Sequence, residues 1–144
     1  MRAAICIVAL LVCRPSWAQD AKKLHSTKTF QCIFSVNANA AMESDNPRPA
    51  IRREEFSLTF DQIDGAAGKG RMIGNQGGED VTVVPAPEAI TLIEVLGSGL
   101  LQITVIYAAQ KSDGQFKAVH SRHSAMFGGM PVPSQYYGAC RALL

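Results

Sequence analysis

The sequence predicts an all-β fold, an antiparallel meander of seven or eight short strands. Several segments alternate apolar with polar residues, and no segment keeps the 3.6-residue period of an amphipathic helix. Turn residues recur roughly every 8 to 12 positions, which is typical of a small barrel or a sandwich. The barrel is favoured over the sandwich because a cysteine lies near each end of the predicted domain, and a crosslink there would bring the first and last strands together.

The amino terminus carries the features of an export signal. Arg2 supplies a positive charge, Ala3 to Val12 is an unbroken apolar run, and Ser16-Trp17-Ala18 places small residues where a signal peptidase reads them. The run is too short for a transmembrane helix, which needs about 20 residues. Residues 1–18 are therefore predicted to be a cleaved signal peptide, and residues 19–144 to form one domain that is periplasmic or secreted.

Lipidation at Cys13 is the competing interpretation of the same segment. It is disfavoured because Val12 is bulkier than the small residue that precedes a lipidated cysteine. No later apolar stretch is long and uncharged enough to cross a bilayer, so no membrane span is expected in the mature chain.

The four cysteines divide between the predicted signal and the predicted domain. Cys6 and Cys13 belong to the signal, and Cys32 and Cys140 remain. Two cysteines in an exported chain indicate one disulfide, and closing a loop of about 100 residues stabilises a fold by about 4 to 5 kcal/mol. Free thiols or an intermolecular bridge are the alternatives. A redox-active pair is not expected because the chain has no Cys-x-x-Cys spacing.

The first half of the predicted domain holds the two clearest strands. Gln19–Ser26 is polar and has no period, which indicates a frayed terminus. Asn37–Pro49 is rich in Asn, Ala and Pro and is expected to be a loop. The strands on either side of it alternate with a period of two. Their buried positions are expected to be Phe30, Cys32, Phe34 and Val36 in the first, and Phe56, Leu58 and Phe60 in the second.

The second half consists of short strands separated by Gly and Pro. Asp113-Gly114 is a hairpin signal because this pair tolerates positive φ. Gly128-Gly129 and Pro131-Val132-Pro133 are expected to break the chain before its last strand. The expected strands are Arg71–Ile73, Val81–Val84, Ile90–Leu96, Leu100–Tyr107, Phe116–Ala125 and Gln135–Leu143.

Charge gives no reason to expect a nucleic acid or an anionic membrane as partner. The whole chain has a net charge of +2, and loss of Arg2 and Arg14 with the signal leaves 12 basic residues against 12 acidic ones. A neutral, mixed surface attracts neither polyanion.

The one concentrated polar group is His120-Ser121-Arg122-His123. A two-residue turn at Asp113-Gly114 would pair Tyr107 with His120 and place Tyr107, His120 and Arg122 on one apolar face. A few polar groups on such a face are typical of a small-molecule pocket. In the alternative interpretation, His120 and Arg122 face solvent and Val119 is buried, and a shift of one residue in the turn would decide between the two.

Other motifs indicate neither catalysis nor a metal nor a cofactor. His120 and His123 point to opposite faces of a strand and cannot share one metal ion. Ser121 and Ser124 lack the Gly-x-Ser-x-Gly context of a hydrolase nucleophile. Asp61–Gly65 lacks the spacing of a calcium loop, and Gly74–Gly78 lacks the Lys and the following helix of a phosphate loop. We expect a protein that is not an enzyme.

An exported meander of this length resembles the eight-stranded barrels of the lipocalins and avidins in length and strand spacing. Lipocalins carry Gly-x-Trp on the first strand, and avidins line their pocket with Trp. Here Thr29-Phe30-Gln31-Cys32 stands at that position, and the only Trp, Trp17, lies in the predicted signal. The resemblance implies a barrel and transfers no functional residue.

These observations predict a domain that binds rather than catalyses. The first hypothesis is a small apolar or amphipathic ligand held near Tyr107, His120 and Arg122. The second is an interaction or inhibitor module that contacts an envelope protein through Asn37–Pro49 or Ala125–Pro133. A hydrolase is a distant third.

Overall fold

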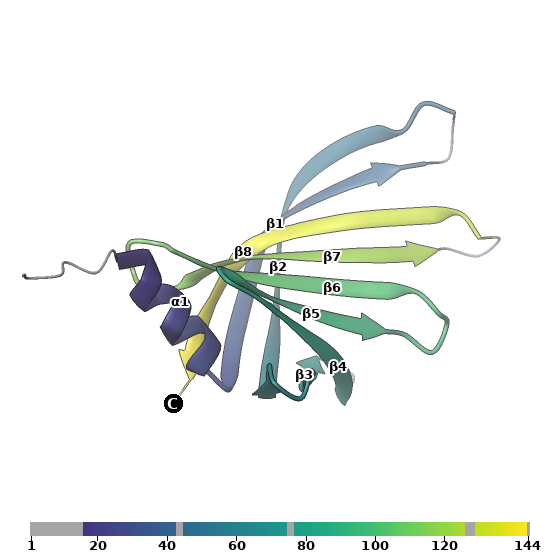
Figure 1. The fold of residues 1–144 in the computed structure, drawn as a ribbon. Coiled ribbons are helices and arrows are strands. Elements are labelled where there is room, and N and C mark those ends of the chain that lie inside the picture. The colour runs from purple at the N-terminus through teal and green to yellow at the C-terminus, as the bar shows by residue number, and fades with distance from the viewer. Residues whose placement is uncertain (1–15, 43–44, 75–76, 126–128, 144) are drawn as a thin grey trace, which may run out of the picture.

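The computed structural model describes residues 16–42, 45–74, 77–125 and 129–143, and within them the chain forms a closed eight-stranded antiparallel barrel and one helix (Figure 1). Most of the predicted export signal, with Cys6 and Cys13, lies outside the described residues. The elements are α1 (Ser16–Ser26), β1 (Thr29–Ala41), β2 (Arg48–Asp64), β3 (Lys69–Gly74), β4 (Gly77–Ala86), β5 (Ala89–Val95), β6 (Leu101–Gln110), β7 (Phe116–Ala125) and β8 (Pro131–Leu143).

Barrel closure and the crosslink confirm the predicted fold class. Each strand pairs with the next along the chain, and β8 pairs with β1. Cys32 and Cys140 lie directly opposite each other across this last pair and form a disulfide over a sequence separation of 108 residues. Both cysteines are fully buried, so the covalent link lies inside the barrel at the seam where its two ends meet.

The core is made by the inward positions of the alternating strands. Phe30 and Phe116 meet edge to face near the disulfide, with ring centroids 5.9 Å apart. Aromatic and branched side chains fill the middle of the barrel. The largest fully buried ones are Phe30, Phe34, Phe60, Phe116, Leu24, Leu92 and Ile106.

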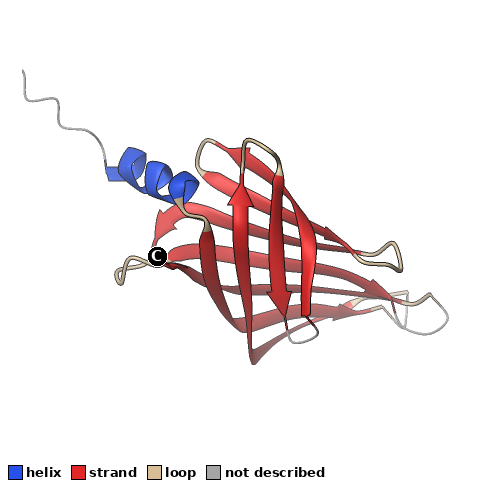
Figure 2. Cartoon of the chain, turned by 90° about the horizontal axis from the view of Figure 1, so that it is seen from below, coloured by secondary structure: helices blue, strands red, loops and turns tan. Residues whose placement is uncertain are grey.

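Gln19–Ser26 is not a frayed terminus, as the sequence predicted, but belongs to α1. Figures 1 and 2 both show α1 at the end of the barrel where β1 starts and β8 ends, which we call the helix end. Leu24 is fully buried there, and Gln110 Nε2 donates to Asp20 Oδ1 at 3.0 Å. Only Ala21 and Leu24 are apolar in this segment, which is too few to give a visible period, but both pack against the core and fix the helix. Among the described residues, no helix is long and apolar enough to cross a membrane.

The predicted loop Asn37–Pro49 is mostly strand. β1 continues to Ala41 and β2 begins at Arg48, while residues 43–44 lie outside the described part of the chain. The pairing of β1 shifts between Phe34 and Val36, which is a β-bulge. The bulge turns Asn37 into the barrel in place of Val36, so the prediction that Val36 shares the face of Phe34 is wrong.

The expected break at Pro131–Pro133 is also absent, since β8 begins at Pro131. β8 pairs with β7 along this stretch, but its pairing with β1 ends at Ser134. Before Ser134, the side of β8 that faces β1 therefore has no paired strand among the described residues. Proline is tolerated there because no backbone N–H is needed for pairing.

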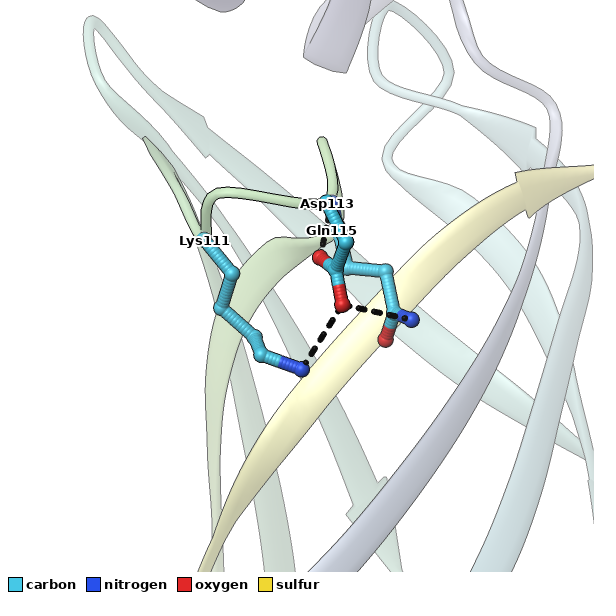
Figure 3. Close-up of polar contacts among 3 residues, drawn as sticks. All are labelled: Lys111, Asp113 and Gln115. Atoms are coloured by element: carbon cyan, nitrogen blue, oxygen red, sulfur yellow. Dashed lines mark hydrogen bonds and ion pairs between the residues drawn. The ribbon is translucent and has the colours of Figure 1, made fainter.

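The hairpin between β6 and β7 forms where Asp113-Gly114 predicts it, with Gly114 at a φ of 78°. The loop is closed by Lys111 N–H, which donates to Gln115 O at 2.8 Å. The Asp113 carboxylate accepts from Lys111 Nζ at 3.0 Å and from Gln115 N–H at 3.1 Å (Figure 3). Three residues rather than two thus separate the closing pair, which changes the register of the following strand.

Candidate functional site

The structure separates the three residues predicted to form a pocket. His120 is fully buried inside the barrel, and Arg122 points the same way and is half-buried. Tyr107 lies on the outer wall with 40% of its surface exposed. The alternative with His120 facing solvent is therefore wrong, and so is the placement of Tyr107 beside it. His123 is exposed on the opposite face of β7, as strand alternation predicts.

The register of β6 against β7 explains the position of Tyr107. The partner of His120 is Thr104, three residues from the predicted partner Tyr107. The longer loop accounts for part of this offset, and an irregularity between Ile106 and Gln110 accounts for the rest. An odd offset exchanges the two faces of a strand, so β6 presents Thr104 inward and Tyr107 outward.

His120 lies at the centre of an aromatic and polar cluster. Its ring is 5.6 Å from the ring of Phe34, 5.5 Å from Phe56 and 6.1 Å from Tyr136. Burial and the positive charge of Arg122 lower the pKa of His120 to about 3. The imidazole is therefore neutral at physiological pH.

The hydrogen bonds of His120 define its tautomer. Arg122 Nε can only donate, and it lies 3.1 Å from His120 Nε2, so Nε2 is the acceptor. The ring proton is then on Nδ1, which donates to Thr104 Oγ1 at 2.7 Å. Gln102 Oε1 lies 3.2 Å from Nε2, but both atoms are acceptors in this tautomer, so the bond to Nε2 is the one from Arg122. His120 thus acts as a fixed support that orients Arg122.

Arg122 is held on two aromatic faces. Its guanidinium carbon lies 4.6 Å from the ring centroid of Phe56 and 4.9 Å from that of Tyr136. Among the described residues, no carboxylate lies within ion-pair distance of it. The guanidinium is therefore positioned by protein contacts while its charge has no direct counter-ion in the described structure.

Glu94 is a site residue that the sequence analysis missed. It is 4% exposed, its Oε2 has no hydrogen-bond partner among the described residues, and burial raises its pKa, with a further contribution from Glu79 and an opposing one from Arg122. Glu94 pairs with Gln102, and Gln102 pairs with Arg122, so the three form an inward row across β5, β6 and β7. Its position on the same strand face as Ile90 and Leu92 is the signal that could have identified it.

Asn37 is the second buried polar group with an unused atom. Its Nδ2 donates to Glu54 Oε2 at 2.8 Å, but its Oδ1 is buried and has no partner in the described part of the chain. The bulge in β1 turns it inward, and it pairs with Tyr136 of β8. We call the set of Asn37, Glu94, Gln102, Thr104, His120 and Arg122 the polar cluster.

The polar cluster lies in the half of the barrel away from the helix end, beyond the packed aromatic core. It combines a guanidinium that has no ion-pair partner among the described residues, although Glu94 interacts with it electrostatically, and two buried acceptor atoms without donors there. Buried groups of this kind are rarely left unsatisfied in proteins. The arrangement is suited to holding a polar group from outside. Within the described residues, no three His, Cys, Asp or Glu side chains are grouped so as to hold a metal ion.

Comparison with protein-family models, with curated proteins and with solved structures gives no significant match. The fold itself therefore defines the class of this protein: a small closed barrel of eight antiparallel strands with one internal disulfide.

Proposed function

We propose that this domain is a binding protein that takes a small amphipathic ligand at the end of the barrel opposite α1, with an anionic group of the ligand on Arg122. The observation that carries the proposal is the guanidinium of Arg122, fixed on Phe56 and Tyr136 and lacking a carboxylate partner among the described residues. Arginine in a partly desolvated site binds carboxylates strongly because its N–H groups match their two oxygens.

The aromatic rings beside Arg122 support an amphipathic rather than a purely polar ligand. Phe56 is half-buried and stacks on Phe34, with centroids 5.0 Å apart, so it offers an apolar wall next to the charge. The core between this wall and the helix end is filled by side chains, which favours a short ligand near the rim over a long one threaded through the barrel.

Calorimetric titration with octanoate tests this proposal. Octanol is the control, because it has the same chain length but no charge. We expect octanoate to bind and octanol to bind at least about tenfold more weakly. Arg122→Gln should remove this difference, while Arg141→Gln, on an exposed position of β8, should keep it. Octanoate binding that is absent, or equal in wild type and Arg122→Gln, would overturn the proposal.

Binding is favoured over catalysis by the surroundings of His120. Its ring nitrogens bond to Thr104 and Arg122, and neither of these is a serine or a carboxylate of the kind found in a hydrolytic triad. A buried imidazole that remains neutral and fully bonded is suited to support, not to proton transfer.

We infer that this domain is exported from the cytoplasm. The sequence signal at residues 1–18 and the internal disulfide support it, since disulfides persist in oxidising compartments. The predicted cleavage point after Ala18 falls within the first turns of α1 and leaves Leu24 and Asp20 on the mature side. Mass spectrometry of the protein recovered from the envelope or medium should give a chain that starts at Gln19, a chain there that retains Met1 would contradict cleavage, and recovery from the cytoplasm alone would contradict export.

A further inference from the structure

The outer wall of β5 and β6 is one of two uncharged stretches of the described barrel surface, the other being that of β1. Its outward positions carry no charge, whereas those of β2 include Arg53, Glu55 and Asp61. Val95 is 65% exposed and Tyr107 is 40% exposed on this wall. Exposed apolar surface of this kind marks an interaction site. The outward residues are Ala89, Thr91, Ile93 and Val95 on β5, and Leu101, Ile103, Val105, Tyr107 and Ala109 on β6.

Tyr107 stands between two hollows on this wall. One hollow, of about 470 Å³, lies toward the β4–β5 turn and is lined by Pro87 and Glu88. The other, of about 430 Å³, lies toward β7 and β8 and is lined by Lys117 and Tyr137. Tyr107 and Ala109 border both hollows. A protruding ring flanked by hollows can interlock with a surface of the same shape.

Opposite charges lie on the two sides of Tyr107. Glu88 precedes Ala89, the ladder partner of Tyr107, and Lys117 precedes Ala118, the partner of Ile106. Both charged side chains are exposed, and neither forms an ion pair with another described residue. From the β4–β5 turn across β6 to β7, an acidic, an aromatic and a basic side chain thus follow one another at one level of the barrel.

We propose that this wall is the interface of a homodimer in which two copies pack face to face about a two-fold axis that runs along β6 near Tyr107. Rotation about such an axis exchanges the two sides of the wall. It brings Glu88 of one protomer against Lys117 of its partner, twice by symmetry, and places the two Tyr107 rings next to each other at the axis, each beside the hollows of the other copy. The acid and the base at equal level on either side of the ring make the wall complementary to itself, which is why a second copy is the occupant we propose. This inference does not depend on the ligand proposed for the polar cluster.

Charge reversal with rescue tests the dimer. In sedimentation equilibrium we expect the wild type to dimerise, and Glu88→Lys or Lys117→Glu alone to raise the dissociation constant at least about tenfold, because each places like charges in contact at two symmetric points. The double variant with both reversals should regain the affinity of the wild type. Lys69→Glu, an exposed lysine on β3, should leave it unchanged.

Three outcomes would overturn the proposal. The first is a wild type that stays monomeric at the highest concentration at which it remains dissolved, which would leave the wall to a different partner. The second is dimerisation that neither reversal weakens. The third is a double variant that folds, with the circular dichroism and melting temperature of the wild type, but does not recover the dimer.

Discussion

Thr104 lies directly opposite His120 across β6 and β7, and its hydroxyl accepts a hydrogen bond of 2.7 Å from His120 Nδ1. Both residues are buried. This pair fixes the imidazole, the imidazole accepts from Arg122, and Arg122 is thereby presented on its two aromatic neighbours. The binding proposal therefore rests on a register that places Thr104, and not Tyr107, beside His120.

Thr104→Val should destabilise the fold by about 1 to 3 kcal/mol, because the substitution keeps the shape and leaves the Nδ1 proton of His120 buried without an acceptor. The free energy of unfolding from urea titration measures this loss. Thr82→Val, at an exposed outward position on β4, is the matched control and should change it little. Equal stability of Thr104→Val and the wild type would show that the hydrogen bond contributes nothing.

The strands and their faces could largely be predicted from residue alternation. Phe116–Ala125 is β7 with the predicted bounds, and Phe56, Leu58 and Phe60 point inward as expected. The crosslink could be predicted from two cysteines in a chain with an export signal, and barrel closure followed from the crosslink because it brings the first and last strands together.

The register and the site could not be predicted in the same way. One extra loop residue and an irregularity before Gln110 decide which face of β6 is buried. Neither feature can be recognised from the alternation of apolar and polar residues. The bulge after Phe34 likewise brings Asn37 inside, and α1 is recognised only through the burial of Leu24. These features depend on contacts between segments far apart in the sequence.

His120 should resist protonation until the pH approaches 3. The unfolded chain takes up this proton as the pH falls below about 6.5 and the folded chain does not, so the stability that His120 contributes is complete above 6.5 and is lost as the pH falls toward 3. NMR of the imidazole nitrogens measures the protonation directly, with exposed His25 and His123 as spectral references. Protonation of His120 near 6.5 in the folded state would contradict its burial in the polar cluster.

Glu94 should give the stability of the fold the opposite dependence on pH. Its pKa is raised in the folded state, chiefly by burial, so the stability associated with its neutral form is present below its ordinary pKa and is lost as the pH rises through the folded value. Glu94→Gln removes that dependence and should make the protein more stable than the wild type at neutral pH. Unfolding curves recorded across this pH range test it, with exposed Glu55→Gln as control. Parallel pH profiles for Glu94→Gln and the wild type would refute the prediction.

Loss of the disulfide should lower stability by about 4 to 5 kcal/mol, since the bond closes a loop of 108 residues in sequence separation. Cys32→Ser should therefore lower the melting temperature substantially under oxidising conditions. Reductant should lower the melting temperature of the wild type and leave that of Cys32→Ser unchanged. A melting temperature that does not respond to either treatment would mean that the bond is not structural.

Gly138→Ala should damage the closure of the barrel itself. Gly138 lies opposite Phe34 at the bulge in β1, and a Cβ there would overlap the carbonyl oxygen of Ile33 and come within 2.7 Å of Phe34 Cα. The obstacles are backbone atoms of the neighbouring strand, so no side chain can move aside. We expect a loss of several kcal/mol, on the scale of about 4 that marks a severe substitution. Gly97→Ala adds the same methyl group where nothing lies within 4 Å and should be tolerated. Urea unfolding measures the stability of both variants. Equal stabilities would contradict the close approach of β1 and β8 at this bulge.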